Sequence, residues 1–404
     1  MKRLVVVGAS LAGLRAVESA RKAGFDGEIT LIGAEKHLPY DRPPLSKAYL
    51  DAPEPEVPLY RTRGELHDLG VQLRLGQPAT GLDLDRRTVD CGGDTIEYDG
   101  LVIATGATAR AMPATDRLTG VHTLRTLDDA RAVRAALDAG ARTVIVGAGF
   151  IGSEIASGAR KRGLTVTVLE AQHTPLARAV GDVMGAACAR LHTLNGTDLR
   201  CGVEVSAIEG DGHVERVRLI DGSVIEADLV VLGIGAAPAT GWLEGSGLEL
   251  DNGIACDMTL MAAAGVYAAG DVARWHNPAF DRPMRLEHWT SAQEQGAVAG
   301  RNAVDPAHAT VYSTIPYFWS DWYGSRIQFA GVPDATEFEV LGSPEHGRFL
   351  ALYGNGEYLT GALTLNGQPD IMKLRALIAE RTPWQSAVTF AQQRAALWRA
   401  ERAS

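Results

Sequence analysis

The sequence predicts an α/β protein in which one strand–turn–helix–strand unit occurs twice and is followed by a smaller α+β domain. Three observations predict this fold class. Residues 4–24 and 143–163 align with each other without a gap. A chain of 404 residues is too long for one ordinary core. Its composition, with 46% hydrophobic and 22% charged residues, is typical of a globular protein.

Both copies of the unit have the form of a dinucleotide-binding fingerprint. Each begins with β-forming residues, turns at glycines, and enters a helix with small residues on one face. A second β-rich run then ends in an acid, Glu35 in ITLIGAE and Glu170 in TVTVLE. An acid about 20 positions beyond the glycines accepts hydrogen bonds from a ribose diol. Together the two copies predict two Rossmann-like dinucleotide-binding domains.

Three positions of each glycine turn have a physical role. The first glycine permits a tight turn, the second position lets the backbone approach a pyrophosphate, and the third lets helix and strand pack closely. The phosphates then lie at the positive end of the helix. These positions are Gly8, Ser10 and Gly13 in the first copy, and Gly147, Gly149 and Gly152 in the second. The serine is small enough for the approach, but it makes the first copy less specific taken alone.

Two further segments indicate that one nucleotide is a flavin dinucleotide. LVIATGA (101–107) and VYAAGDVA (266–273) read as buried strands ending in small-residue turns. The second ends at Gly270-Asp271, which places a carboxylate where a ribityl hydroxyl can donate to it. The alternative for Asp271 is an ordinary helix N-cap. Enzymes with two such sites usually hold a flavin dinucleotide tightly and exchange a nicotinamide dinucleotide at the other.

The segment YDRPPLSK (40–47) places a cation on each side of two prolines. Prolines fix φ and push the preceding residue towards extended geometry, so Arg42 and Lys47 cannot share a regular helix across them. One interpretation is a surface loop with solvated charges. The other is a rigid segment that presents both cations to an anionic ligand.

The combination of VVVGASLAG, YDRPPLSK, LVIATGA, VIVGAGFIGSE, YAAGDVA, EHWTSAQEQG and YFWSD resembles the ferredoxin reductases of bacterial oxygenase and cytochrome P450 systems. These are the putidaredoxin reductase and biphenyl dioxygenase reductase type, within the glutathione-reductase-like flavoprotein fold. The resemblance runs from residue 4 to about residue 330, and RPPLSK and FWSD are its most specific pieces. It implies FAD at the first fingerprint and NADH at the second.

The resemblance also implies the residues that bind the two nucleotides. For FAD they are Gly8, Ser10, Ala12, Gly13, Glu35, Arg42, Lys47, Ala79, Arg125, Gly270, Asp271 and Trp289. For NADH they are Gly147, Gly149, Ile151, Gly152, Glu170 and Gly235.

Lys47 and Glu154 are implied to pair where flavin and nicotinamide meet, and both are expected to be catalytic. A fixed cation there stabilises negative charge that develops on the flavin during reduction. The alternative for Glu154 is a first-turn helix acid, stabilised by the helix dipole.

The residues after Glu170 favour NADH over NADPH. Ala171, Gln172 and His173 follow it, with no arginine to clasp a 2′-phosphate. A carboxylate at this position accepts the 2′-hydroxyl and repels a phosphate. Arg178 lies eight residues on, where it can in principle curl back.

The four cysteines, Cys91, Cys188, Cys201 and Cys256, do not fit the thiol chemistry known for this fold. No CxxC pair exists, and PPLSKAYLDAP lacks the cysteine of disulfide reductases and peroxidases. The spacing fits neither a disulfide framework nor a zinc ribbon, so we expect no metal and a cytoplasmic protein. Electrons must therefore leave directly from the flavin, which converts a two-electron donor into one-electron steps. A small iron–sulfur protein is the natural partner.

Trp289 in EHWTS and Trp319 in FWSDW are implied to lie beside the flavin and between it and the docking surface. We expect both to take part in electron flow; the alternative is packing alone. Candidates for a basic docking patch are Arg282, Arg285, Arg301 and Arg326. Each of these is more often a solvated surface charge. His288 is expected to be structural.

The repeat predicts an interrupted first domain. Residues 1–110 and 230–308 form the FAD domain, residues 111–229 the NAD domain, and residues 309–404 the α+β domain. Within the last, YGNGEYLTGALTLNGQ (353–368) predicts a hairpin and AVTFAQQRAALWRA a closing helix.

The function expected is NADH oxidation with transfer of single electrons to a ferredoxin, a [2Fe–2S] or similar iron–sulfur protein, that feeds an oxygenase or cytochrome P450. The chain is expected to act as a monomer or homodimer. Alternatives are a rubredoxin reductase, an NADH oxidase or quinone-type reductase, and a redox switch like apoptosis-inducing factor.

Bulk features exclude other function classes. The formal net charge of −10 gives no basic footprint for nucleic acid. No apolar run reaches the roughly 18 residues of a membrane span. MKRLVVVGAS runs straight into a glycine turn and therefore predicts a first strand, not a signal peptide.

Overall fold

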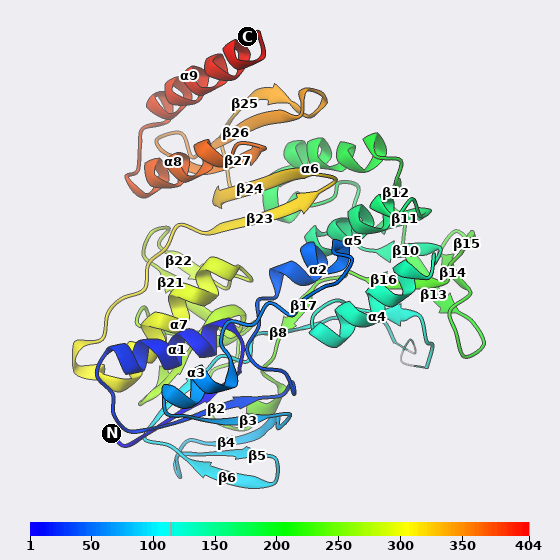
Figure 1. Cartoon of the computed structure of the whole chain (residues 1–404). Coiled ribbons are helices and arrows are strands. Elements are labelled where there is room, and N and C mark those ends of the chain that lie inside the picture. The colour runs from blue at the N-terminus through cyan, green and yellow to red at the C-terminus, as the bar shows by residue number, and fades with distance from the viewer. Residues whose placement is uncertain (114, 116, 404) are drawn as a thin grey trace. The chain divides into compact units, whose positions relative to one another are not determined.

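The computed structural model describes residues 1–113, 115 and 117–403 (Figure 1). The chain folds into two compact units. Unit 1 contains Met1–Asp41, Val57–Thr108 and Ala236–Thr314, and unit 2 contains Arg42–Glu56, Ala109–Gly235 and the chain from Ile315 onwards.

Unit 1 is built on a six-stranded sheet whose order is β19-β20-β7-β1-β2-β3. Its strands are β1 (Arg3–Val7), β2 (Glu28–Gly33), β3 (Val71–Leu75), β7 (Gly100–Ile103), β19 (Met261–Ala263) and β20 (Val266–Ala268). All neighbours are parallel except β19 and β20. β1, at the centre, is LVVV after its first residue and has no exposed side chain, as expected for a strand covered on both faces.

Helices α1 (Leu11–Lys22) and α7 (Trp289–Val304) lie side by side in unit 1 (Figure 1). Two α7 glycines permit this contact. An added Cβ would lie 2.2 Å from Ala12 O at Gly296 and 2.2 Å from Ala16 O at Gly300. The remaining elements of unit 1 are α3 (Arg63–Asp68), β4 (Ala79–Asp83), β5 (Thr88–Cys91), β6 (Asp94–Glu97), β17 (Ala236–Pro238), β18 (Ile254–Cys256), β21 (Ala273–Asn277) and β22 (Arg282–Met284). β17 pairs with β8 (Ala107–Ala109).

Unit 2 contains a second parallel sheet, in the order β12-β11-β10-β16-β9. Its strands are β9 (Val121–His122), β10 (Thr143–Val146), β11 (Val166–Glu170), β12 (Asp198–Cys201) and β16 (Leu229–Leu232). Its helices are α4 (Leu127–Asp138), α5 (Phe150–Lys161) and α6 (Ala177–Leu194). An antiparallel sheet is added by β13 (Val205–Glu209), β14 (Arg216–Leu219) and β15 (Val224–Glu226).

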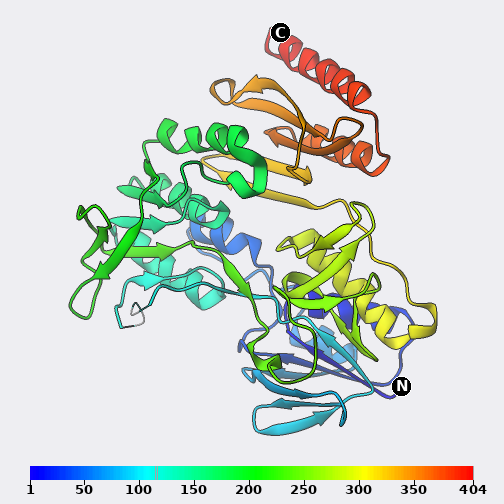
Figure 2. The ribbon, with the colours of Figure 1, turned by 180° about the vertical axis from the view of Figure 1, so that it is seen from behind.

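The last part of unit 2 is an antiparallel sheet in the order β23-β24-β27-β26-β25. Its strands are β23 (Tyr317–Trp322), β24 (Ser325–Gly331), β25 (Glu337–Ser343), β26 (Arg348–Gly354) and β27 (Leu359–Leu365), followed by α8 (Gln368–Ala379) and α9 (Trp384–Ala403). Figure 2 shows this sheet beside α6, and buried side chains of α6 and of the sheet share one core.

Two expectations for this region are confirmed with shifted ends. The hairpin exists, but its first strand begins at Arg348, which pairs with Ser343 of β25, and β26 pairs with β27 from Phe349 onwards. The closing helix begins at Trp384. Parallel sheets followed by an antiparallel sheet with helices confirm the expected α/β fold class.

The segment Arg42–Glu56 belongs to unit 2 because α4 and α5 hold it. It contains the 3₁₀ helix η1 (Pro43–Ser46) and α2 (Ala48–Asp51). Arg134 of α4 donates to the carbonyls of Tyr49 and Leu50 at 2.8 and 3.1 Å. Arg162, just after α5, donates to Leu50 O.

In the part of the chain that the structure describes, no helix is both long and apolar enough to cross a membrane. The same residues include no group of three or more His, Cys, Asp or Glu side chains able to hold a metal ion.

Candidate functional site

The first glycine turn, between β1 and α1, has no room for side chains. Gly8 has φ +118°, and an added Cβ would lie 2.0 Å from Ala104 O. At Gly13 the same atom would lie 1.8 Å from Gly8 O. Ser10 is the N-cap of α1, yet its side chain makes no capping hydrogen bond, and no acid lies in the first turn. The positive end of α1 is therefore open to an anion.

The second turn, between β10 and α5, repeats this arrangement in unit 2. Gly147 has φ +102°, and a Cβ there would lie 2.3 Å from Gly233 O. A Cβ on Gly152 would lie 2.4 Å from Gly147 O. Gly149 is the N-cap of α5, which also has no side-chain cap and no acid in its first turn. Ile151, in that turn, is 43% exposed.

Two other helices, α3 and α4, are capped by side chains, whereas α6, α7 and α8 start without a side-chain cap, as α1 and α5 do. α3 and α4 each begin with a capping box, Thr62 with Glu65 and Thr126 with Asp129. In each box a hydroxyl accepts from the backbone and a carboxylate accepts in return. An anionic side chain at the start of α1 or α5 would occupy the place where a pyrophosphate binds.

The two fingerprint acids are held by hydrogen bonds within their own units. Glu35 accepts from the Tyr40 hydroxyl at 2.6 Å. Glu170, the last residue of β11, accepts from the backbone N–H groups of Ala148 and Gln172, each at 2.9 Å. The contact with Ala148 fixes the acid against the glycine turn.

The Gly270-Asp271 turn meets the start of α1 within unit 1. A Cβ on Gly270 would lie 3.1 Å from the Ala12 Cβ. Asp271 lies inside a 3₁₀ helix, Gly270–Val272, whose N-cap is Ala269, so the N-cap alternative for Asp271 is wrong. The Gly270 N–H donates at 2.8 Å to Gln295 Oε1 of α7. Gln295 is 1% exposed, and its Nε2 has no partner in the described structure.

The residues of unit 1 fit a flavin dinucleotide. A glycine turn without side chains, an open helix N-terminus and a buried amide donor left without a partner are the features such a ligand requires. Trp289 is fixed beside them, because its Nε1 donates to Asp41 Oδ1 at 2.8 Å and to the Tyr60 hydroxyl at 3.0 Å. Ala79 lies at the start of β4, against the core of unit 1.

In YDRPPLSK the two prolines form the first turn of η1, with Arg42 as its N-cap and Lys47 as its C-cap. The two cations are thus fixed by the backbone at opposite ends of one 3₁₀ turn. Arg42 donates at 2.6 Å to the carbonyl of Arg125, whose own N–H donates to Asp129 at 2.9 Å. This rigid segment is the second of the two interpretations; its ligand stays a prediction.

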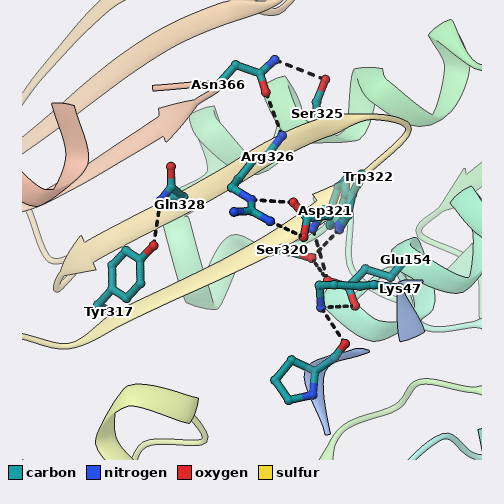
Figure 3. Close-up of polar contacts among 11 residues, drawn as sticks. Lys47, Glu154, Tyr317, Ser320, Asp321, Trp322, Ser325, Arg326, Gln328 and Asn366 are labelled. Carbon is teal, nitrogen blue, oxygen red and sulfur yellow. Dashed lines mark hydrogen bonds and ion pairs between the residues drawn. The ribbon is translucent and has the colours of Figure 1, made fainter. Parts of the chain in front are cut away.

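The predicted pairing of Lys47 with Glu154 is confirmed. Lys47 Nζ lies 2.8 Å from Glu154 Oε2, and their side chains are 18% and 3% exposed. Figure 3 shows the two facing each other below β23. The first-turn alternative for Glu154 is wrong, because α5 begins at Phe150 and Glu154 is its fifth residue. The residue is held by neighbouring segments and not by the helix end.

Three further groups donate to the Glu154 carboxylate. Ser46 Oγ donates to Oε2, and Ser320 Oγ of β23 donates to Oε1. The Asp321 N–H is 3.3 Å from Oε1. Trp322 Nε1 in turn donates to Ser320 Oγ at 2.8 Å (Figure 3). A buried carboxylate stays ionised only with such partners.

Trp319 lies next to this cluster in sequence but points away from it. Successive strand residues face opposite sides, so Ser320 and Trp319 occupy different faces of β23. The Trp319 ring stacks on Tyr317, with centroids 6.2 Å apart and an interplanar angle of 27°. Its role in electron flow stays a prediction.

Two arginines proposed for docking are engaged in ion pairs. Arg326 binds both carboxylate oxygens of Asp321, at 2.7 and 3.0 Å. Arg285 pairs with Glu287 at 2.8 Å and donates to Asp271 O at 3.0 Å. Arg282 lies on β22, and Arg301 lies in the last turn of α7. The surroundings of His288 lower its pKa to about 4, through burial.

All four cysteines are free thiols. Burial raises the pKa of Cys188 and of Cys256 to about 12, and it also raises the pKa of Cys91 and Cys201. Because the thiolate is the reactive form, these groups are unsuited to thiol–disulfide chemistry.

Comparisons with known proteins agree with this site. A family model described as pyridine nucleotide-disulphide oxidoreductase matches residues 2–296. The chain belongs to the pyridine nucleotide-disulphide oxidoreductases. A second model, described as reductase C-terminal, matches residues 317–399. The family uses FAD and NAD(H), which agrees with the two fingerprints.

Among the relatives, rhodocoxin reductase of Rhodococcus erythropolis is 37% identical over 94% of this chain and 90% of its own length. The ferredoxin–NAD(+) reductase component of the anthranilate 1,2-dioxygenase system of Burkholderia cepacia is 36% identical over 93% of each chain. The crystal structure of the covalent putidaredoxin reductase–putidaredoxin complex contains a chain that is 30% identical, with a TM-score of 0.91, and the match covers 97% of this chain and 99% of that one. This pyridine nucleotide-disulphide oxidoreductase thus matches reductases along nearly its whole length.

Sequence reasoning missed several residues of the site. Ser46 lies within the quoted PPLSK motif, but a serine hydroxyl gives no signal of its own. Ser320 and Trp322 lie in YFWSDW, where the alternation of buried positions was the available signal. Gln295 lies in EHWTSAQEQG, and an amide on the buried face of a helix was the signal there.

Proposed function

We propose that this chain oxidises NADH and passes single electrons to a ferredoxin, which supplies an oxygenase or cytochrome P450. One observation carries the proposal, the similarity over 93% of both chains to a reductase named for ferredoxin and NAD(+). A bound FAD would supply the conversion of a two-electron donor into one-electron steps.

The chain's own groups bind and orient the two nucleotides. The open ends of α1 and α5 favour the two pyrophosphates, and Glu35 and Glu170 favour the two riboses. Glu170, anchored to the Ala148 N–H, repels a 2′-phosphate, so we propose NADH as the preferred donor.

Lys47 and Glu154 are proposed to act at the reacting centre. Lys47 offers a positive charge on a side chain that is still 18% exposed, while Glu154 is its fixed counter-charge. A preorganised cation stabilises negative charge that develops during reduction. Since the thiols are protonated, electrons leave without a cysteine relay. The four free thiols also support our proposal of a cytoplasmic location.

The test is NADH-driven reduction of cytochrome c by the purified holoprotein, with and without a [2Fe–2S] ferredoxin, alongside an NADPH control. We expect strong dependence on ferredoxin and a clear preference for NADH. Rapid NADH consumption that tracks oxygen and ignores ferredoxin would show an NADH oxidase instead. Turnover with a rubredoxin but not with a ferredoxin would identify a rubredoxin reductase. Negligible turnover with a stable reduced complex would indicate a redox switch.

A further inference from the structure

The carboxylate of Glu154 is held from two sides by different parts of unit 2. Oε2 accepts from Ser46 and Lys47, which belong to the segment around η1. Oε1 accepts from the Ser320 hydroxyl and the Asp321 N–H, which belong to β23. The last sheet of the chain therefore supplies half of the hydrogen bonds to a residue of the α5 helix.

The hydrogen of the Ser320 hydroxyl has one direction available. An indole N–H is a donor only, so the 2.8 Å contact from Trp322 Nε1 makes the Ser320 oxygen an acceptor. The hydroxyl hydrogen is then directed to Glu154, which is the acceptor when ionised. Ser320 and Trp322 have no exposed surface, so neither exchanges its partner for water.

Lys47 differs from Ser320 in its freedom to move. Its side chain is long and 18% exposed, and its Nζ also lies 3.3 Å from Pro43 O. When Lys47 leaves Glu154, the carboxylate keeps donors from Ser46, Ser320 and the Asp321 backbone. A buried carboxylate that lost its one cation without such donors would be strongly destabilised.

We infer that Ser320 is a positioning residue, which holds the Glu154 carboxylate in place independently of Lys47. Trp322 sets the direction of its hydroxyl. Lys47 is thereby able to move between Glu154 and a bound nucleotide without leaving an unsatisfied charge behind. This inference rests on the proposed function, because it assigns the first strand of the last sheet to the NADH half of the reaction.

Other charged groups near Glu154 are accounted for. The Asp321 side chain is neutralised by Arg326. On α6, His192 contacts the neighbouring Ser153, and burial lowers the pKa of His192 to about 4. Lys47 is the cation that faces the carboxylate from the η1 segment.

The first experiment measures the rate of flavin bleaching by NADH in rapid mixing, as a function of NADH concentration, without any ferredoxin. Loss of a charge-assisted hydrogen bond leaves the Glu154 carboxylate less firmly placed, so the limiting rate of Ser320→Ala falls about 10-fold while the NADH concentration that gives half of this rate stays unchanged. Trp322→Phe, which keeps the hydroxyl but frees its direction, lowers the limiting rate by less. Ser325→Ala, on the next strand with a 3.5 Å contact from Asn366, leaves the limiting rate unchanged.

The second experiment needs no turnover. Urea unfolding of the holoprotein is compared for wild type, Ser320→Ala, Glu154→Gln and the double variant. We expect the effect of Ser320→Ala to fall by at least half in the Glu154→Gln background, because the charged acceptor is absent. Additive effects, or a limiting rate that stays unchanged in folded Ser320→Ala, would overturn the inference. Both readouts are independent of the ferredoxin assay, so failure of the proposed partner leaves them interpretable.

Discussion

The two fingerprint helices, α1 and α5, begin alike and then differ along their buried faces. Both start at a side-chain-free glycine turn and both lack an N-terminal side-chain cap. The buried face of α1 is entirely apolar or glycine. The buried face of α5 includes Ser153, Glu154 and Ser157.

Matched positions of the repeat show where this difference lies. Leu14 of α1 corresponds to Ser153 of α5, and both are fully buried. Arg15 of α1 corresponds to Glu154, but Arg15 forms a local pair with Glu18 at 2.5 Å. Ser157, which corresponds to Glu18, accepts at 2.7 Å from the Tyr323 N–H of the last sheet.

The comparison indicates that α1 serves to hold a nucleotide, whereas α5 also carries the group proposed to react. α1 is closed against α7 by backbone contacts at Gly296 and Gly300, which suits a resident ligand. α5 uses its polar face to connect η1, α6 and β23 around one carboxylate. The glycine turn alone therefore identifies a nucleotide site, while the fifth residue of the helix marks the proposed reactive one.

The largest effect on stability is expected at the backbone contact between α1 and α7. A Cβ at Gly300 would lie 2.2 Å from Ala16 O and 2.5 Å from Ala16 Cα, both backbone atoms. Gly300→Ala must therefore push the helices apart, and we expect a loss of about 3 kcal/mol in the free energy of unfolding, with release of flavin. Urea unfolding and flavin absorbance measure both.

Gly158→Ala of α5 is the matched control. Its Cβ would meet a side-chain atom, Asp51 Oδ1, at 3.3 Å, and helix propensity compensates, so we expect a change within about 1 kcal/mol. Equal losses of unfolding free energy in the two variants would contradict the view that α1, and not α5, is packed by close backbone contacts.

The next effect concerns the buried ion pair of α5. Lys47→Met removes the ammonium group that faces Glu154, and we expect NADH-driven flavin reduction to slow about 100-fold. The comparable Lys161–Asp51 pair, at 2.5 Å, also connects α5 with the segment Arg42–Glu56, but Lys161 is 53% exposed. Lys161→Met should leave the rate unchanged and cost less than about 1 kcal/mol in stability. A similar slowing in both variants would mean that the segment matters only as a whole.

A third effect is a pH dependence from His192 of α6, which contacts Ser153 on the polar face of α5. Burial lowers the pKa of His192 to about 4, against an ordinary value of 6.5. The unfolded chain takes up this proton first, so stability is full above pH 6.5 and falls as the pH drops towards 4. Between pH 7 and 5 the loss from this residue is about 2 kcal/mol.

His192→Gln tests the assignment. The amide can replace contacts with Ser153 and Tyr323 without titrating. We expect its unfolding free energy to fall less than that of the wild type between pH 7 and 5, with His288 titrating in both proteins. Parallel curves for the two proteins would show that His192 contributes nothing to the pH dependence.

The parts of this site that the sequence predicts are those with local signals. The glycine turns are predictable because the space at Gly8 and Gly147 admits no side chain, so the residue type itself is the signal. The terminal acids are predictable because each follows its turn within a short run of sequence. Resemblance to a family supplied the Lys47–Glu154 pair, whose members lie 107 positions apart. No local pattern indicates such a distance.

The hydroxyl groups that donate to Glu154 could not be predicted from the sequence. Ser320 lies 166 positions from Glu154, and serine is too common for its position to carry information. The burial of Glu154 depends on where α5 begins. Because the helix begins at Phe150, Glu154 lies beyond the first turn and is a buried acid, not a helix-end acid. The assignment of Arg42–Glu56 to unit 2 likewise depends on hydrogen bonds from Arg134 and Arg162, which no motif records.

The smallest effect concerns the second acid, where the two copies of the fingerprint again differ. Glu170 accepts from the backbone N–H groups of Ala148 and Gln172, whereas Glu35 accepts from the Tyr40 hydroxyl. Glu170→Gln keeps an acceptor oxygen for the ribose but removes the charge that repels a 2′-phosphate. We expect the ratio of kcat/KM for NADH to that for NADPH to fall about 10-fold, mainly through better use of NADPH. Glu35→Gln should leave this ratio unchanged and weaken flavin retention instead. A loss of NADH preference in Glu35→Gln would show that the two copies have been assigned to the wrong nucleotides.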